Sequence, residues 1–329
     1  METNSFKSAF DLIARLKAGL ERVIKGRTDT IDLLLTALIA DGHVLLEDYP
    51  GSGKTTLTKA LGGLISSNLS QHGMGHILPF RRIQFTPDML PGDVLGVNVF
   101  EPKSASFHFL HGPVFAHVLL ADEINRTGPK VQAAFLECMA EKQVTIDNVT
   151  HPLDDLFFVV GTQNPLDFAG TYPLPLVQLD RFMFKVPMHY VNRDVEIQIL
   201  EQHSEINDNL QHVSAVCTRQ EILESRKLVE KITVAPALRE AVVDVIRATR
   251  SSPLLQFGAS TRAALMLQRA IRGYALINQR DFATEDDLKT MIPVTLLHRI
   301  KFHGGAGDPF QSLMKIVEPE LEKLILKRG

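Results

Sequence analysis

The chain is poor in cysteine, has no tryptophan and carries almost no net charge. Its two cysteines, Cys138 and Cys217, lie far apart without a CxxC motif or neighbouring histidines, which argues against a disulfide framework or a structural zinc site and favours a reducing cytoplasm. A net charge of −3 over 329 residues gives no global attraction to nucleic acid or to an anionic membrane. No apolar run approaches the ~18 residues that cross a bilayer, and the N-terminus lacks a signal-peptide pattern. We therefore expect a cytoplasmic protein that does not insert into membranes.

The remaining composition is that of a globular protein with room for about two domains. Hydrophobic residues make up 45% and charged residues 22% of the chain, an ordinary balance for such proteins. In the first 190 residues short apolar runs alternate with helical patterns, which predicts a parallel sheet covered on both faces. Two hairpins are expected to interrupt this alternation, at residues 97–110 and 143–153. The expected strands lie at residues 43–47, 82–85, 117–121, 156–161 and 182–187.

Beyond about Tyr190 the strand patterns end and helical patterns continue. Thr218 and Thr284 precede Glu221 and Asp287 by three positions, the spacing of a capping box at a helix start. The sequence thus predicts an α/β domain at residues 1–190 and an all-helical domain at residues 191–329. The expected helices of the second domain lie at residues 193–203, 219–231, 236–249, 261–278, 285–298 and 310–327.

The segment from Asp48 to Thr56, DYPGSGKTT, carries the strongest chemical signal. It lies between a predicted strand and a predicted helix, the context of a phosphate-binding loop. Glycines let backbone N–H groups approach a triphosphate closely, and the helix N-terminus adds its positive dipole end. Lys54 would place a cation at the outer phosphates, and Thr55 a hydroxyl at Mg²⁺. Because the general pattern has glycine at the position of Asp48, the alternative is a Gly/Pro-rich loop that merely happens to carry Lys-Thr.

Two adjacent carboxylates follow the next strong strand pattern. Asp122 and Glu123 come directly after the apolar run at residues 117–121, and ligands bind at the carboxyl ends of parallel strands. Asp122 would hold Mg²⁺ as the partner of the loop hydroxyl, and Glu123 would polarise the attacking water as a general base. A solvated acidic pair at a strand end is the alternative reading.

Three further side chains could complete such a site. Asn164 follows the strand at residues 156–161 and can both donate and accept a hydrogen bond, so it could sense a γ-phosphate; otherwise it belongs to a simple Asn-Pro turn. Arg181 could be structural and paired with Asp180, or could face the nucleotide of a neighbouring subunit. Arg262 opens a predicted helix, where a cation opposes the helix dipole, so it could serve something outside that helix.

In this order these elements resemble the AAA+ ATPases, and in detail the MoxR family, in the helix-2-insert group related to magnesium chelatase ATPase subunits. The resemblance covers nearly the whole chain, and Asp48 is a residue that this family often shows. It is carried by GHVLLEDYPGSGKT (residues 42–55), RIQFTPDMLPGDVLG (82–96), GPVFAHVLLADEINR (112–126), GTQNP (161–165), GTYPLPLVQLDRF (170–182) and GASTR (258–262).

The resemblance implies ATP or ADP bound between an α/β domain and a helical lid. Asn164 would be sensor 1 and Arg262 sensor 2, while Arg181, or else Arg126, would act as an arginine finger across a subunit boundary. The hairpin at residues 97–110 would be the helix-2 insert, which in ring ATPases often points toward the pore or substrate. The residues implied in nucleotide binding are Ile24 and Gly26 near the adenine, then Pro50, Gly51, Ser52, Gly53, Lys54, Thr55, Thr56 and Asp122, with Thr55 and Asp122 at Mg²⁺.

The same resemblance implies a ring-forming homo-oligomer, expected to be a hexamer, that remodels partner proteins. Proteins with a von Willebrand factor A domain are the partners it suggests. A nucleic-acid motor related to MCM helicases is one alternative, although the hairpin at residues 97–110 contains a single lysine and lacks the interleaved basic and aromatic residues of such motors. A nucleotide-gated scaffold with little turnover is the other alternative.

Overall fold

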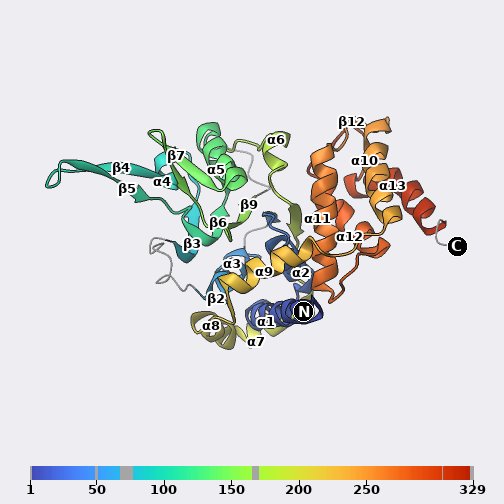
Figure 1. Cartoon of the computed structure of the whole chain (residues 1–329), viewed down its shortest axis with the longest axis horizontal. Coiled ribbons are helices and arrows are strands. Elements are labelled where there is room, and N and C mark those ends of the chain that lie inside the picture. Colours follow the sequence, from blue (N-terminus) through green and yellow to red (C-terminus); the bar gives the residue numbers. More distant parts are fainter. Residues whose placement is uncertain (1, 49–50, 67–76, 165–169, 306, 327–329) are drawn as a thin grey trace.

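The short apolar runs form the central layer of the molecule. A computed structural model describes residues 2–48, 51–66, 77–164, 170–305 and 307–326 (Figure 1), with the backbone alone for residues 2–4, 48 and 325. Tyr49 and Pro50 of the predicted phosphate loop, and the side chain of Asp48, lie outside the described residues.

The predicted parallel sheet is confirmed. Its five strands lie in the order β10-β1-β9-β6-β3, and every neighbouring pair runs parallel. All seven residues of β6 are buried, as expected for a strand covered on both faces. The strands are β1 (Val44–Asp48), β3 (Leu78–Gln84), β6 (Ala116–Asp122), β9 (Phe158–Gln163) and β10 (Phe184–Met188).

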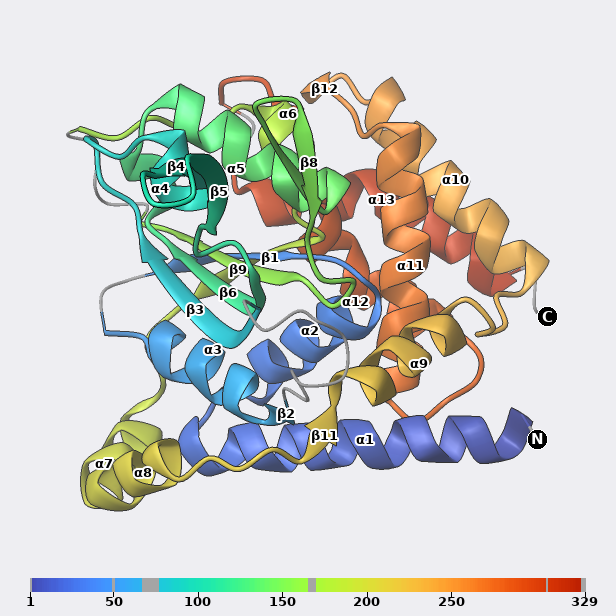
Figure 2. The same ribbon diagram turned by 60° about the vertical axis from the view of Figure 1, so that its left-hand side comes forward.

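Alternate residues of these strands face two separate hydrophobic cores. Val118 and Leu120 of β6 belong to one core, and Leu119 and Ala121 to the other, because successive side chains of a strand point to opposite faces. Helices α1 (Glu2–Val23), α2 (Thr28–Ile39) and α3 (Lys54–Gly63) contribute to the first core. Helix α5 (Pro129–Glu141) packs on the second. Figure 2 shows these helices on opposite sides of the sheet.

Both predicted hairpins are present. Strands β4 (Gly96–Glu101) and β5 (Ser106–His111) follow the short helix α4 (Pro91–Leu95), and β4–β5 extends away from the body of the molecule (Figure 1). Strands β7 (Gln143–Ile146) and β8 (Val149–Pro152) form the second hairpin. Two further short elements are the 3-10 helix η2 (Ile124–Arg126), which contacts β9, and helix α6 (Leu176–Leu179).

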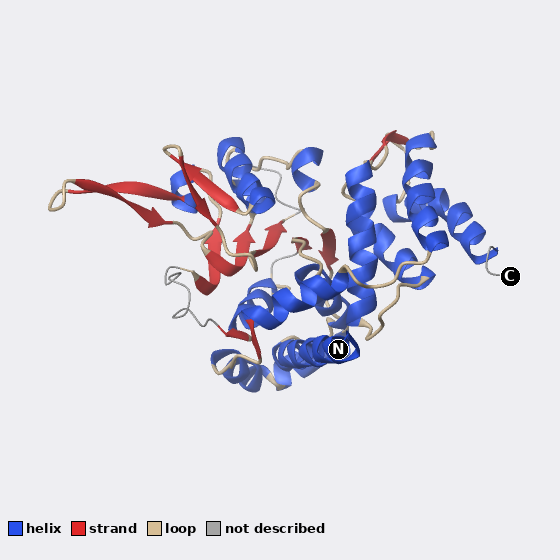
Figure 3. Cartoon of the chain, in the orientation of Figure 1, coloured by secondary structure: helices blue, strands red, loops and turns tan. Residues whose placement is uncertain are grey.

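The C-terminal part is mostly helical, but the all-helical prediction is wrong in detail. Strand β11 (Cys217–Thr218) pairs with β2 (Ile65–Ser66), and β12 (Leu255–Phe257) pairs with β13 (Lys301–Phe302) (Figure 3). Segments of two or three residues are too short to show alternation in a sequence. The helices are α7 (Arg193–Glu201), α8 (His203–Gln211), α9 (Arg219–Val229), α10 (Pro236–Ser251), α11 (Thr261–Ile277), α12 (Glu285–Leu296) and α13 (Pro309–Leu326), of which α8 was not expected. The capping boxes at Thr218 and Thr284 are both formed.

Helix α9 is fastened to the α/β unit by buried polar contacts. Arg219 Nε donates to both oxygens of Asp154, at 2.8 and 2.9 Å, and Arg226 Nε donates to the carbonyl of Leu38 at 3.0 Å. Asp154 is only 3% exposed. The division at residues 190 and 191 stays a prediction, and in this structure the segment just beyond it is held to the sheet.

Asp154 provides a pH-dependent contribution to the stability of this attachment. Burial alone would raise the pKa of Asp154, but hydrogen bonds from His117, Arg219 and the Leu156 N–H hold it at about 2. The ionised carboxylate therefore stabilises the fold above its unfolded pKa of 3.8, and this contribution is lost as the pH falls toward about 2.

Replacing Asp154 with asparagine should accordingly lower the free energy of unfolding most near neutral pH. The difference in the free energy of unfolding between wild type and D154N, measured by urea unfolding, should decrease steadily as the pH is lowered below about 4. Asp155→Asn is the control, because the neighbouring Asp155 side chain is 80% exposed. A gap that stays constant down to acidic pH would contradict the assignment.

Candidate functional site

The predicted phosphate loop connects the end of β1 to the start of α3. Gly51 and Gly53 have φ angles of 85° and 90°, in the left-handed region that side chains disfavour. Apart from its chain neighbours, no described residue has an atom within 4 Å of a β-carbon placed on Gly51, so the backbone there faces open space. Lys54 is the first residue of α3 and follows Gly53 at the N-cap. The loop therefore presents backbone and a helix N-terminus to an open region.

Several loop side chains contribute polar groups to this region. Ser52 is 8% exposed, yet its buried hydroxyl has no hydrogen-bond partner among the residues that the structure describes. Thr55 and Thr56 are half-buried in the first turn of α3. The Lys54 ammonium lies 3.3 Å from Asp122 Oδ1. Hence the structure brings the loop cation and the first predicted carboxylate together.

Asp122 stands at the buried end of β6. It is 2% exposed, and Thr162 Oγ1 donates to its Oδ1 at 2.7 Å while Arg82 Nη2 lies 2.6 Å from its Oδ2. Burial would raise the pKa of Asp122, but the hydrogen bonds from Thr162 and Arg82 and the charges of Lys54 and Arg82 lower it below its ordinary value. Asp122 therefore carries a negative charge at neutral pH.

Glu123 turns away from the strand into a polar cluster. Its φ of 57° is left-handed, and its backbone N–H donates to Thr162 Oγ1 at 2.8 Å. Gln84 Nε2 donates to Glu123 Oε2 at 2.6 Å, and Arg126 Nε lies 3.1 Å from the same oxygen. The side chain of Glu123 is thus held at the sheet edge by groups from β3 and η2.

The remaining residues predicted near the nucleotide lie around this edge. Asn164 directly follows β9, which lies between β1 and β6. Ile24 is buried, and its Cδ1 would lie 3.8 Å from a β-carbon on Gly53, so Ile24 packs against the loop. Gly26 has a φ of 67°, and a β-carbon there would meet Val195 of α7 at 2.6 Å. Accordingly, the segment after α1 runs past the phosphate loop and under α7.

The suggestion that Arg181 pairs with Asp180 is wrong. Arg181 Nη1 donates to the carbonyl of Leu136 in α5 at 2.8 Å. Asp180 instead accepts from Arg299 Nε at 2.7 Å, and its other oxygen lies 3.8 Å from Nε of Arg262. Arg299 is 7% exposed and needs this carboxylate as a counter-charge, which a side chain 119 positions away provides. Arg262, in the first turn of α11, has a side chain that is 63% exposed.

The sequence analysis missed three side chains of this site. Arg82 and Gln84 are two positions apart on β3, so they share one face of the strand, and Gln84 is in register with Asp122. Thr162 is the residue of β9 that bridges Asp122 and the Glu123 backbone. A usable signal for Arg82 and Gln84 was present in the sequence: they are polar residues at alternate positions of a strand that joins a buried sheet.

Comparisons with known proteins agree with this geometry. The family model described as "ATPase family associated with various cellular activities (AAA)" matches residues 43–184, and the AAA lid domain matches residues 247–320. The uncharacterized protein YeaC of Bacillus subtilis (strain 168) is 40% identical over 295 residues, covering 90% of this chain and 88% of the relative. Chaperone MoxR1 of Mycobacterium tuberculosis is 35% identical over 290 residues, covering 85% of this chain and 73% of the relative.

The chain belongs to the MoxR family of AAA+ ATPases. The crystal structure of a candidate ATPase from Cytophaga hutchinsonii supports the same conclusion, with a TM-score of 0.86 and 35% identity, covering 98% of this chain and 97% of that one. As a MoxR-family ATPase, the chain binds a nucleotide and hydrolyses ATP.

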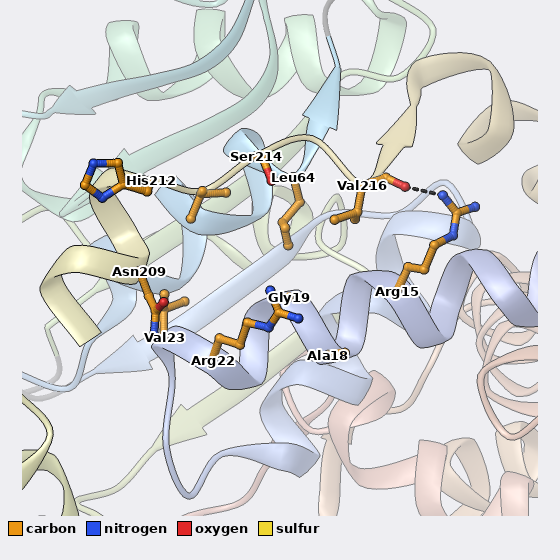
Figure 4. Close-up of a pocket in the computed structure, with 11 residues that line it drawn as sticks. Arg15, Ala18, Gly19, Arg22, Val23, Leu64, Asn209, His212, Ser214 and Val216 are labelled. Atoms are coloured by element: carbon orange, nitrogen blue, oxygen red, sulfur yellow. Dashed lines mark hydrogen bonds between the residues drawn. The ribbon is translucent and has the colours of Figure 1, made fainter. Parts of the chain in front are cut away.

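A cavity of this MoxR-family ATPase lies away from the phosphate loop. It measures about 210 Å³ and is lined by α1, the end of α3 and residues 212–216 (Figure 4). Two of its polar residues form ion pairs: Arg15 lies 2.6 Å from Glu221, and His212 lies 3.0 Å from Asp208. Leu64 in its wall follows the C-terminal end of α3, opposite Lys54, and a ten-residue helix is about 15 Å long. This cavity is therefore not part of the site at the sheet edge.

The described part of this MoxR-family chain lacks two features. Among the residues that the structure describes, no group of three or more His, Cys, Asp and Glu side chains is placed to hold a metal. Within the same described ranges, no helix combines the length and apolar character needed to cross a membrane.

Replacing Thr162 with valine should destabilise the ATPase by about 1–3 kcal/mol, because it leaves the Glu123 N–H without its acceptor and removes one of the donors to Asp122. Urea unfolding of the nucleotide-free protein measures the change. Thr145→Val is the matched control, since Thr145 bonds only the exposed Thr150 at the surface of the second hairpin among the contacts described. Equal effects of the two substitutions would contradict the bridging role of Thr162.

Proposed function

We propose that the chain is a magnesium-dependent ATPase that acts as a chaperone-like remodelling factor on partner proteins, as a ring of identical subunits. The observation that carries the proposal is the 3.3 Å approach of Lys54 to Asp122, beside an open glycine loop. A lysine and a carboxylate at one sheet edge can serve the phosphates and the metal of a single nucleotide.

The residues at this edge fit a Mg²⁺-nucleotide. Gly51 leaves room for phosphate oxygens, and within the described ranges no group forms a hydrogen bond with the buried hydroxyl of Ser52. Asp122, with its lowered pKa, and the Thr55 hydroxyl are oxygen donors of the kind that Mg²⁺ prefers, and this ion usually keeps several waters. A bound Mg²⁺ would neutralise charge on the phosphates. Thr55 and Asp122 would hold that ion, and Lys54 would bind the outer phosphates.

Glu123 is proposed as the general base. It lies one position beyond Asp122, and its carboxylate is held by Gln84 and Arg126. A carboxylate next to the metal ligand can accept the proton of a water that attacks the γ-phosphate. Asn164 would orient that water, and Ile24 and Gly26 would border the adenine.

Arginines from outside the loop are proposed to complete the site. Arg262, with its exposed side chain, would be the sensor on the lid, and Arg181 would reach the nucleotide of a neighbouring subunit. Arg126 is the other candidate for this role, although in this structure it contacts Glu123 of its own chain. A finger that arrives from a neighbour requires assembly, and we propose a ring of six subunits.

Protein rather than nucleic acid is the proposed target. The β4–β5 hairpin exposes apolar side chains, including Phe100 at 50% and Phe107 at 70%, whose ring centroids lie 5.2 Å apart. Such a surface suits a protein partner better than a phosphate backbone, which is bound by lysine and arginine. The relative named Chaperone MoxR1 supports this direction. We propose partners with a von Willebrand factor A domain. We also propose that the protein acts in the cytoplasm, because its two cysteines are free and buried, as is usual in a reducing compartment.

Glu123→Gln should reduce ATP turnover by at least about 100-fold, because it removes a general base. The variant should still bind ATP with wild-type affinity, measured by calorimetry. Glu137→Gln, on the exposed side of α5, is the matched control and should retain turnover. Cellular function that survives in E123Q would favour the nucleotide-gated scaffold over the remodelling ATPase.

Arg181→Ala should lower turnover by roughly 10³-fold if this arginine completes a neighbour's site. Mixing R181A with E123Q should then restore part of the activity, because an E123Q subunit can supply Arg181 to an R181A subunit whose Glu123 is intact. The same mixture with Arg126→Ala distinguishes the two candidate arginines. Dilute monomers that hydrolyse ATP as fast per subunit as the concentrated protein would rule out an arginine acting between subunits.

The nucleic-acid alternative has its own test. Adding single-stranded or duplex DNA should leave ATP turnover unchanged at any salt concentration. Stimulation by DNA that weakens steeply with salt would reverse the choice, whereas stimulation by a purified protein with a von Willebrand factor A domain would support it.

A further inference from the structure

One side chain from the helical lid holds the backbone on both sides of Arg181. Arg299 follows α12, and its Nη2 donates to the carbonyls of Asp180 at 3.1 Å and Phe182 at 2.5 Å. Its Nη1 donates to the carbonyl of Met183 at 3.1 Å, and its Nε donates to Asp180 Oδ1 at 2.7 Å. A single guanidinium therefore binds three main-chain oxygens and one carboxylate within residues 180–183.

The contacts of Arg299 are sheltered from water, which makes them hard to break. The Arg299 side chain is 2% exposed and that of Asp180 is 23% exposed. Hydrogen bonds of a charged group are stronger than neutral ones, and a buried charge that loses its partner is costly. Arg262 lies 3.8 Å from the other oxygen of Asp180, but its side chain is 63% exposed, so that contact contributes little. Of these two lid arginines, Arg299 therefore provides the firmer link to Asp180.

The other restraints on the segment that carries Arg181 are less directional. Helix α6 precedes it, and the four residues of α6 are half-buried or exposed. The guanidinium of Arg181 donates to a neutral acceptor, the carbonyl of Leu136 in α5. Phe182 is fully buried, but burial of an apolar ring is non-directional, whereas hydrogen bonds fix the orientation of the carbonyls that accept them. The backbone direction at residues 180–182 therefore depends on Arg299.

We propose that Arg299 is a positioning residue for Arg181, so that the lid of one subunit sets how well its own Arg181 reaches the nucleotide of the neighbouring subunit. This inference rests on the proposed action of Arg181 between subunits. The planar fork of an arginine can bind several oxygens at once, as this position requires. Helix α11 of the same lid carries Arg262, the proposed sensor of the subunit's own nucleotide. The state of one site can therefore reach the next site through the lid and Arg299.

The first test compares the ATP turnover of two Arg299 variants with that of wild type. Arg299→Gln should lower turnover by about 100-fold, the scale of a misplacement of about 1 Å. Arg299→Lys should lower it by about tenfold, because lysine keeps the charge without the fork. Both variants should bind ATP with wild-type affinity in calorimetry, because Arg299 is not among the residues proposed to bind the nucleotide of its own subunit. Urea unfolding reports whether each variant is folded, and R299K replaces R299Q throughout if R299Q is not.

Arg280→Lys is the matched control within the lid. Arg280 donates to both oxygens of Asp287, at 2.8 and 2.6 Å, and to the carbonyl of Phe282 at 3.0 Å. Asp287 is 1% exposed, so this pair is also sheltered, but these contacts lie within the lid. R280K should therefore lower the free energy of unfolding and leave the ATP turnover of the folded protein unchanged. An equal loss of turnover in R280K and R299K would show that any loosening of the lid suffices, and would overturn the proposal.

Mixed assemblies give the readout that a purely structural role would not produce. In an equal mixture of R299Q and E123Q, the R299Q subunits keep Glu123 and receive a well-placed Arg181 from E123Q neighbours. Turnover should therefore rise well above that of either variant alone. In an equal mixture of R299Q and R181A, each Arg181 is missing or misplaced, so turnover should stay low. The double variant R299Q/R181A should be no slower than R181A, because both changes disable the same contact.

The outcomes separate this inference from the function on which it rests. If R181A and E123Q recover activity together but R299Q and E123Q do not, Arg299 acts on its own site and the proposal is overturned. Wild-type turnover in R299Q would overturn it as well. If R181A keeps wild-type turnover, or is not rescued by E123Q, the proposed action of Arg181 between subunits is itself wrong, and the positioning role of Arg299 fails with it.

Discussion

Asp122 carries its charge at a place where only 2% of the residue is exposed, and a buried charge is tolerated only with partners. Those partners come from three separate elements: Lys54 from the phosphate loop, Arg82 from β3 and Thr162 from β9. The need to compensate one carboxylate therefore fixes the loop and two strands relative to β6. The position of Glu123 follows as well, because Thr162 holds its backbone through the other side of the same hydroxyl.

A second buried charge, that of Arg299, holds the sheet and the lid together in a similar way. Arg299, just after α12, contacts Asp180 and the carbonyls of Phe182 and Met183. Burial lowers the pKa of Arg299 to about 10, with the Asp180 carboxylate opposing the shift, so the guanidinium stays charged. Because Arg181 is covalently next to Asp180, the proposed finger and the helical part are held as one assembly at this point.

Much of the fold could be predicted from local patterns, since buried parallel strands are continuous apolar runs and the phosphate loop has a fixed spacing. The order of the elements and both hairpins followed from such patterns. The contacts that distant segments make could not. Arg82 and Gln84 reach the site only because β3 lies beside β6. Asp180 likewise pairs with Arg299, which lies far along the chain. Strand pairs such as β2–β11 are too short to leave a periodic trace. The individual roles of the site residues and the division at residue 190 stay predictions.

The β4–β5 hairpin forms a two-stranded sheet of its own, and its strands are no part of the five-stranded sheet. Apart from contacts at its base, such as the stacking of Phe109 on His151, its outer residues pack against little of the body. Substitutions along this hairpin can therefore accumulate without disturbing the site at the ends of the central strands. Related chains can therefore differ in this hairpin while keeping the same five-stranded sheet.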